Sequence, residues 1–523
     1  MGGYVADDWQ VSDRLTFSLN LRLENYANPS CDSNCFSRLT TSFAGIPNPA
    51  AVSTPYNQMI ISGQHNAYPN TQTVIWEPRV GIAWRPPHND NTVIRVGAGI
   101  FVDELPGGLA ENVAFNTPNL NAFTVSSGPI APGVPGGLFA TAALANQALL
   151  SQFHSGGSFN SISATVPGFS PPNFFSFPNT FNQPVYYKWN FELQHQLPAK
   201  LLVSLNYSGM HGSHIPVAAF GLNGFCPPSA CPDGFAGLPA APPNAALGVV
   251  NQYLSAGSSN YNGLTISVQR RLSSNLFFNV NYTYSHALDD VSNGGISNLP
   301  FGLLVTNASI TSPQNPFNIR GNYGSADYDV RHYFSTSLVW NDLFRCAGLK
   351  WGPNALFGGW NLSTNWFLRS GLPFTMVDTA DTQALASFNY VGTIFASPLT
   401  TLPRGCSSAV NTPCFNTTQF APAGTLTGFG TGGRNLIYGP HFFNVDIGLM
   451  KEFKIYERMT FSVGAQAYNL FKHPNFDQPV NDIANPNFGL SIANVGPPTS
   501  LLGSFVGAGS SPQFVELRGI VRF

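Results

Sequence analysis

The sequence is poor in charged residues and has no long hydrophobic run. Of its 523 residues only 9% are Asp, Glu, Lys or Arg, whereas an ordinary soluble domain has roughly 25%. The formal net charge is -2, so there is no basic face for nucleic acid and no polybasic run for a charged membrane surface. No stretch of about 18 apolar residues occurs, which excludes a transmembrane helix.

A leader is also missing. The chain starts Met1-Gly2-Gly3-Tyr4, and Asp7-Asp8-Trp9 follows at once. A signal peptide needs a basic segment followed by an apolar one. We therefore expect the sequence to be the C-terminal part of something longer, or a mis-started reading frame.

Motifs for catalysis, cofactors and metals are lacking. The sequence has no nucleophile elbow, no HExxH and no P-loop. Gly428–Gly433 matches G-x-G-x-x-G, but a Thr/Gly/Pro loop surrounds it where a strand and a helix are required. His211 and His214, expected just past a strand end, have no carboxylate nearby to complete a metal site. We predict a protein that is not an enzyme and that has no cofactor and no resident metal.

Aromatic residues, by contrast, are abundant at 13%, and alternating segments recur along the chain. In the last segment charged Glu516 and Arg518 lie on one face, since successive side chains of a strand point to opposite sides. The other face is apolar and resembles the assembly signal of bacterial outer-membrane barrels; it consists of Val515, Leu517, Val521 and the terminal Phe523.

Thirteen such segments predict thirteen strands. Most have about ten residues, the length of a tilted strand that crosses a membrane. The predicted strands are Tyr4–Trp9, Leu15–Glu24, Val74–Arg85, Thr92–Asp103, Val185–Gln196, Leu201–Ser208, Leu264–Arg271, Leu276–Ser285, Arg331–Trp340, Trp360–Gly371, Phe442–Lys454, Met459–Phe471 and the C-terminal strand.

The alternation predicts which side chains face lipid and which face the lumen. Gly81, Gly97 and Gly99 are expected to face a crowded lumen wall. The residues predicted to face lipid are Leu15, Phe17, Leu19, Leu21, Phe278, Val280, Val445, Ile447, Leu517 and Val521. Those predicted to face the lumen are Asn20, Arg22, Asn279, Asp446, Glu516 and Arg518.

The connections between these strands alternate between short and long. Short periplasmic turns and long extracellular loops are typical of outer-membrane barrels, so we predict an all-β, antiparallel transmembrane β-barrel. The loop of roughly 80 residues after Asp103 is expected to have no regular structure. Aromatic residues of the long loops, such as Phe174, Phe175, Phe177 and Phe181, are expected to pack on one another more readily than on a ligand.

One polar cluster stands at a predicted strand start. Asp327, Asp329, Arg331 and His332 are expected to form an ion-paired base that fixes the strand; the alternative is an extracellular rim that contacts solute.

Six of the seven cysteines form closely spaced pairs in loop-like stretches. The simple interpretation is three loop disulfides, Cys31–Cys35, Cys226–Cys231 and Cys406–Cys414, in an oxidising compartment. Zinc is the alternative, disfavoured by unequal spacing and the absence of a nearby His. Cys346 is left over as a free thiol.

Several motifs, in order along nearly the whole chain, resemble TonB-dependent outer-membrane transporters. The Asp7-Asp8-Trp9 segment with Leu15–Glu24 is similar to their DDW…LTL(N)LGLRYE segment. Other segments resemble the Oar-like branch of this family: Ser259-Asn-Tyr-Asn-Gly-Leu264 leading to Asn281-Tyr-Thr-Tyr-Ser-His-Ala-Leu-Asp-Asp290, then Asp327-Tyr-Asp-Val-Arg-His332, Ser370-Gly-Leu-Pro-Phe374 and Asn469-Leu-Phe-Lys-His-Pro-Asn-Phe476.

The resemblance implies energy-coupled uptake of a bulky solute across the bacterial outer membrane. Its implied partners are outer-membrane lipid, the barrel assembly machinery and, through an N-terminal part, the TonB complex. The family's plug domain and TonB box are not in this sequence, and its barrels have twenty-two strands. We therefore expect residues 1–523 to be the C-terminal portion of the barrel, with nine strands and the plug ahead of them.

Two other classes stay open. A passive porin or structural barrel would also alternate in this way, and sequence upstream of Met1 would discriminate. A secreted β-rich binding protein would be soluble without detergent, so fractionation would discriminate.

Overall fold

The computed structural model describes residues 2–72, 74–105, 107–120, 134–135, 137–273, 275–292, 312–346, 353–406, 411–456, 459–495 and 513–523. Within these ranges, no helix is both long and apolar enough to cross a membrane.

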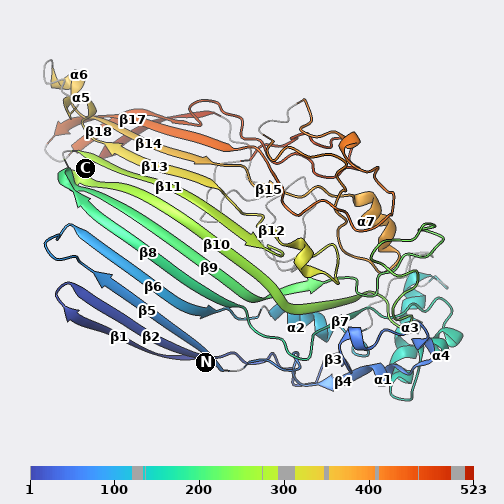
Figure 1. Cartoon of the computed structure of the whole chain (residues 1–523). Helices are drawn as coiled ribbons and strands as arrows, with labels where there is room; N and C mark the ends of the chain where they lie inside the picture. The colour runs from blue at the N-terminus through green and yellow to red at the C-terminus, as the bar shows by residue number, and fades with distance from the viewer. Residues whose placement is uncertain are drawn as a thin grey trace.

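One antiparallel sheet dominates the molecule (Figure 1). Fifteen strands belong to it. Two short ones, β7 (Phe174–Ser176) and β12 (Gly324–Ser325), lie off its main path, which leaves the thirteen strands predicted. In path order they are β1 (Gly2–Ser12), β2 (Leu15–Asn25), β5 (Val74–Trp84), β6 (Thr92–Val102), β8 (Val185–Leu197), β9 (Leu201–Ala219), β10 (Val250–Ser273), β11 (Leu276–Asp289), β13 (His332–Trp340), β14 (Trp360–Arg369), β17 (Phe442–Tyr456), β18 (Met459–Tyr468) and β19 (Phe514–Arg522).

The strand register places apolar side chains on one face of the sheet and polar ones on the other. Phe191, Tyr207 and Leu264 are direct neighbours across β8, β9 and β10, and all three are exposed. One residue away on each of these strands, Asn190, Ser208 and Gly263 form the opposite face. Because side chains alternate along a strand, one residue of slip would reverse both faces.

The predicted inward glycines lie on the polar face. A Cβ built on Gly97 would approach Asn190 Oδ1 to 2.5 Å, and one on Gly99 would approach Arg79 Cγ to 2.9 Å. The polar side chains of the neighbouring strands therefore occupy the space that a larger residue would need.

The two ends of the sheet differ. At the turn end, consecutive strands are joined by tight connections, such as η3 (Pro198–Lys200) between β8 and β9, where Ala199 and Lys200 both have positive φ. At the loop end lies a thick layer of helices, short strands and loops (Figure 1). The chain starts at the loop end and stops at the turn end.

The expectation that the loop after Asp103 has no regular structure is wrong, because it contains α2 (Gly107–Ala114), α3 (Leu138–Phe153), α4 (Phe159–Thr165) and β7. The loops carry short strands and helices, which are β3 (Phe36–Leu39), β4 (Ile60–Gln64), β7, β12, β15 (Pro373–Phe374), β16 (Ile437–Tyr438), η1 (Phe43–Gly45), η2 (Ala51–Ser53), α1 (Tyr56–Met59), α2, α3, α4, η4 (Ile319–Asn322), α7 (Thr379–Ala386) and η5 (Thr417–Gln419). Two further helices, α5 (Leu343–Cys346) and α6 (Asn354–Phe357), lie in a connection at the turn end.

Strands β9 and β10 are also longer than predicted. They stay paired as far as Ala219 and Gln252, so the long connection between them shrinks to residues 220–249. The His211 to His214 segment lies inside β9, not beyond its end.

The loop layer has hydrophobic cores of its own. In one, the fully buried Tyr56 donates a hydrogen bond to the carbonyl of Ala246, 2.9 Å away. In a second, Tyr68, Phe177 and Phe181 pack with ring centroids 4.7–5.3 Å apart. Phe174 and Phe181 are 1% and 0% exposed, in agreement with self-packing of these loop aromatics.

Strands β1 and β19 are the two edges of the sheet. Among the described residues, β1 pairs only with β2 and β19 only with β18. The outward Val515, Leu517 and Val521 oppose Ala467, Ala465 and Phe461 of β18.

Candidate functional site

A buried arginine joins the loop layer to the loop end of the sheet. The Arg434 side chain is 0% exposed and forms ion pairs with Asp289 at the end of β11 and with Asp327, the latter at 3.0 Å. It also donates to the carbonyls of Asn322 and Asp289. A buried guanidinium needs such partners, because an unpaired buried charge costs several kcal/mol.

A second group of polar side chains lies beside it. The buried Asp329 carboxylate accepts hydrogen bonds from the backbone N–H of Ala287 at 2.8 Å and from the Tyr438 hydroxyl at 3.1 Å. Arg331 and His286 approach the same carboxylate at 3.2 Å and 3.1 Å. These contacts join β11 and β16 to the segment that leads into β13.

The four residues predicted as a base or rim thus have different environments. Asp327, Asp329 and Arg331 belong to the ion-paired network, whereas His332 lies on the outward face, where its Nδ1 is 2.8 Å from the Tyr282 hydroxyl. Sequence reasoning missed Arg434, the buried partner of Asp289 and Asp327. Its partners lie 145 and 107 residues away in the chain, and no local motif signals this.

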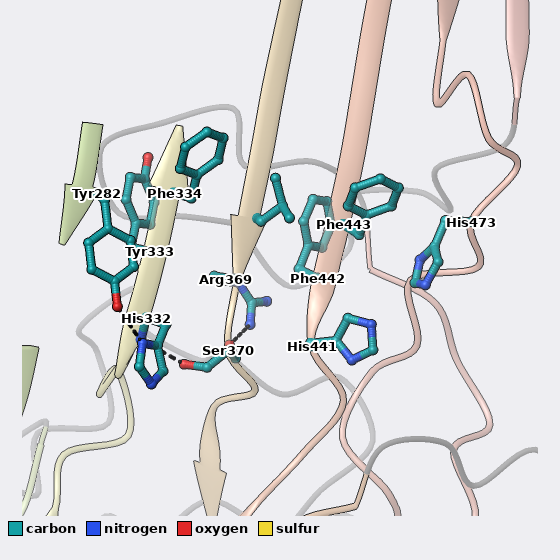
Figure 2. A pocket seen from close by; sticks show the side chains of 11 residues that line it. Tyr282, His332, Tyr333, Phe334, Arg369, Ser370, His441, Phe442, Phe443 and His473 are labelled. Atoms are coloured by element: carbon teal, nitrogen blue, oxygen red, sulfur yellow. Dashed lines mark hydrogen bonds between the residues drawn. The ribbon is translucent and has the colours of Figure 1, made fainter. Parts of the chain in front are cut away.

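An outward depression of about 480 Å³ opens near the loop ends of β11, β13, β14 and β17 (Figure 2). Most of the residues that line it have aromatic or imidazole rings. The lining consists of Tyr282, His332, Tyr333, Phe334, Leu368, Arg369, Ser370, His441, Phe442, Phe443 and His473. The rings of His441 and His473 lie 5.5 Å apart. Amphipathic rings at this level are typical of the interfacial girdle of a membrane barrel.

Near this depression lies a buried carboxyl in the loop layer. Burial raises the pKa of Asp477, while the backbone N–H of Gln478 and the charge of Arg369 act in the opposite direction.

On the inward face, a hollow of about 450 Å³ lies across β5, β6, β8, β9 and β10. Arg79, Gly99 and Lys188 occupy one register row, with the glycine in the middle. Both cations lean on one ring, since Arg79 Cζ lies 4.3 Å and Lys188 Nζ 4.8 Å from the centroid of Phe101.

The two weak motifs of the sequence make local packing and hydrogen-bond contacts. His211 Nδ1 lies 2.8 Å from Asn260 Oδ1 across the β9–β10 pair. Gly430 and Gly432 pack against the backbone carbonyls of Phe395 and Ala396. Among the residues that the structure describes, no group of three or more His, Cys, Asp or Glu side chains could hold a metal.

The three cysteine pairs are joined as disulfides, Cys31–Cys35, Cys226–Cys231 and Cys406–Cys414. All three lie in the loop layer. Cys226 and Cys231 are buried in a cluster with Tyr390 and Leu385.

A large antiparallel sheet with an apolar outward face, a polar inward face, short turns at one end and long loops at the other defines the outer-membrane β-barrel class. The chain belongs to the family described as outer membrane beta barrel domain, whose model matches residues 1–498. The predicted fold class and the outer-membrane location are thereby confirmed.

Three solved structures illustrate the likeness. The outer-membrane transporter YddB of Escherichia coli is 8% identical with a TM-score of 0.43, and the match covers 100% of this chain and 45% of that one. The ferric-catecholate import receptor Fiu of E. coli is 11% identical with a TM-score of 0.39, and the match covers 100% of this chain and 44% of that one. The ferric enterobactin receptor PfeA of Pseudomonas aeruginosa is 9% identical with a TM-score of 0.41, and the match covers 99% of this chain and 44% of that one.

The chain thus spans less than half the length of these structures. A search of curated proteins finds no match.

Proposed function

We propose that this chain is the barrel portion of a TonB-dependent transporter that takes up a bulky solute through the outer membrane. The observation that carries the proposal is the loop layer. Its packed clusters and its Arg434 network form an ordered surface at the loop end. The shared motifs at residues 281–290, 327–332, 370–374 and 469–476 lie in or next to this layer. An ordered surface of this kind suits recognition of a solute before entry.

The proposal includes further strands beyond the thirteen, up to the twenty-two of the family, together with a plug and a TonB box. Two unpaired edges, β1 and β19, support this part. Unsatisfied backbone groups in lipid cost several kcal/mol each, so only closed sheets span membranes. On this proposal TonB relays inner-membrane energy to the plug from the periplasmic side.

We also propose that the outward residues of β19 with Phe523 are recognised by the barrel assembly machinery. Leu517 is 82% and Phe523 92% exposed. A Phe523→Ser variant should reach the outer membrane in smaller amounts than wild type, and a Gln513→Ser variant, altered just before β19, should not. Equal amounts of both would contradict this part.

Uptake profiling tests the transport function for any solute that the growth medium contains. Three strains would be compared by mass spectrometry of the spent medium: wild type, a deletion of this protein and a deletion of TonB. A solute whose consumption is lost in both deletions supports the proposal. Loss only in the first deletion, together with an open channel in planar bilayers, would favour a passive porin.

A further inference from the structure

We propose that the inward hollow around Lys188 binds a carboxylate or phosphate group of the transported solute. This inference rests on the proposed transport function and names a chemical class of solute for it.

The first argument is the pairing of charges on the inward face. Arg22, Arg95 and Arg518 each form an ion pair with a glutamate, Glu24, Glu192 and Glu516 respectively. Lys188 has no ion-pair partner among the described residues, and it is exposed to the lumen. The hollow therefore contains a cation that no described carboxylate neutralises.

The second argument is the lining. Two cations, Arg79 and Lys188, line the hollow together with Asn190 and Ser208, and none of the described residues in its lining is acidic. Arg79 is paired with Glu77 through one terminal nitrogen at 2.7 Å, and Glu77 is not among the described residues that line the hollow.

The third argument is the fixed shape of the site. Gly99 lies between Arg79 and Lys188 in the register, and a Cβ there would approach Arg79 Cγ to 2.9 Å and Phe101 Cε2 to 3.2 Å. The Phe101 ring supports both cations from one side. Small-molecule sites typically measure about 300–1,000 Å³, and the hollow of about 450 Å³ lies in this range.

Charge decides the ligand class. Charge-assisted hydrogen bonds from guanidinium and ammonium groups to carboxylate or phosphate oxygens are about twice as strong as neutral ones. A wall that bears one sign of charge also raises the local concentration of the opposite sign. An anionic group on the solute would therefore bind at this point of the lumen.

Residue-resolved amine labelling tests the proposal. The protein in outer-membrane vesicles would be treated with an amine-reactive reagent in chloride, inorganic phosphate or citrate of equal ionic strength, and the labelling of each lysine followed by mass spectrometry. Phosphate and citrate should slow labelling of Lys188 several-fold and leave Lys200, in the tight turn between β8 and β9, unchanged. An Arg79→Gln variant should weaken this protection, while Arg95→Gln, a matched change on a neighbouring strand, should preserve it.

Two results would overturn the proposal. One is labelling of Lys188 that responds to these anions no more than labelling of Lys200 does. The other is a Lys188 that does not react with the reagent even without added anion, and that reacts only after acidic residues elsewhere in the protein are replaced. This result would mean that a carboxylate of the protein itself fills the hollow. Uptake profiling is independent of both, so energy-dependent uptake with an unprotected Lys188 would remove only this inference.

Discussion

Position 280 offers a sharp test of which face of the sheet meets lipid. Val280 is outward and lies between Val268 of β10 and Thr336 of β13. Its neighbour Asn279 is inward, between Gln269 and Ser337. The two positions share one strand, one depth and the same neighbouring strands, so a Val280→Arg and Asn279→Arg pair differs mainly in the side that receives the charge.

The depth of Val280 follows from strand geometry. It comes four residues after Leu276, the first residue of β11 at the turn end. A rise of about 3.3 Å per residue and a tilt of roughly 40° place it about 10 Å above the turn, near the middle of an apolar band about 25 Å tall. An arginine at the midplane costs about 2–4 kcal/mol on the lipid face, which corresponds to roughly a 30- to 1,000-fold shift in the folding equilibrium.

The assay uses the protein with the further strands proposed above and measures its folded fraction in lipid vesicles over a urea series, read from the gel shift between unheated and heated samples. Val280→Arg should lower the free energy of unfolding by the amount above, and Asn279→Arg should stay near wild type. Equal losses in the two variants would refute the assignment of faces.

Three further predictions concern packing, charge and redox state. Gly209→Ala should destabilise the sheet by about 1–3 kcal/mol, because the new Cβ would come within 2.2 Å of the Trp189 ring. Gly3→Ala is the control, since a Cβ there meets nothing within 4 Å. Equal thermal unfolding of the two variants would contradict this packing. Arg434→Met should leave Asp289 and Asp327 without their buried partner, at a cost of about 3–5 kcal/mol, and should speed proteolysis of the loop layer. Arg320→Met removes a 65% exposed partner of Asp290 and should change the rate of proteolysis little. Mass mapping of non-reduced peptides should find the links Cys31–Cys35, Cys226–Cys231 and Cys406–Cys414, and free thiols at these positions would disprove them.

The membrane strands could be predicted from the sequence because each carries its own signal. In β11, apolar and polar side chains alternate from Leu276 to Ser285, and lipid on one side and lumen on the other impose that alternation directly. Strand β9 shows the limit. Gly209, Gly212 and Pro216 indicate a loop, yet pairing with β10 continues past all three because partner strands supply the hydrogen bonds.

The loop layer could not be predicted for a different reason. Its contacts join segments that lie far apart, as when Tyr56 reaches Ala246 or Arg434 reaches Asp289. The periodicity of apolar residues in the sequence does not indicate which distant residues will pair. Likewise, the hollow at Lys188 needs residues from five strands, and only the register shows that Gly99 separates its two cations.

The separate cores of the loop layer have a practical consequence for handling the protein. They are shielded from water by other parts of the chain, whereas the outward face of the sheet depends on lipid or detergent. A poor choice of detergent should therefore damage the two regions unequally. Antibodies against folded epitopes around Tyr68 and Phe181 should keep binding in preparations whose sheet has already lost its barrel form, so such binding alone is no measure of an intact membrane domain.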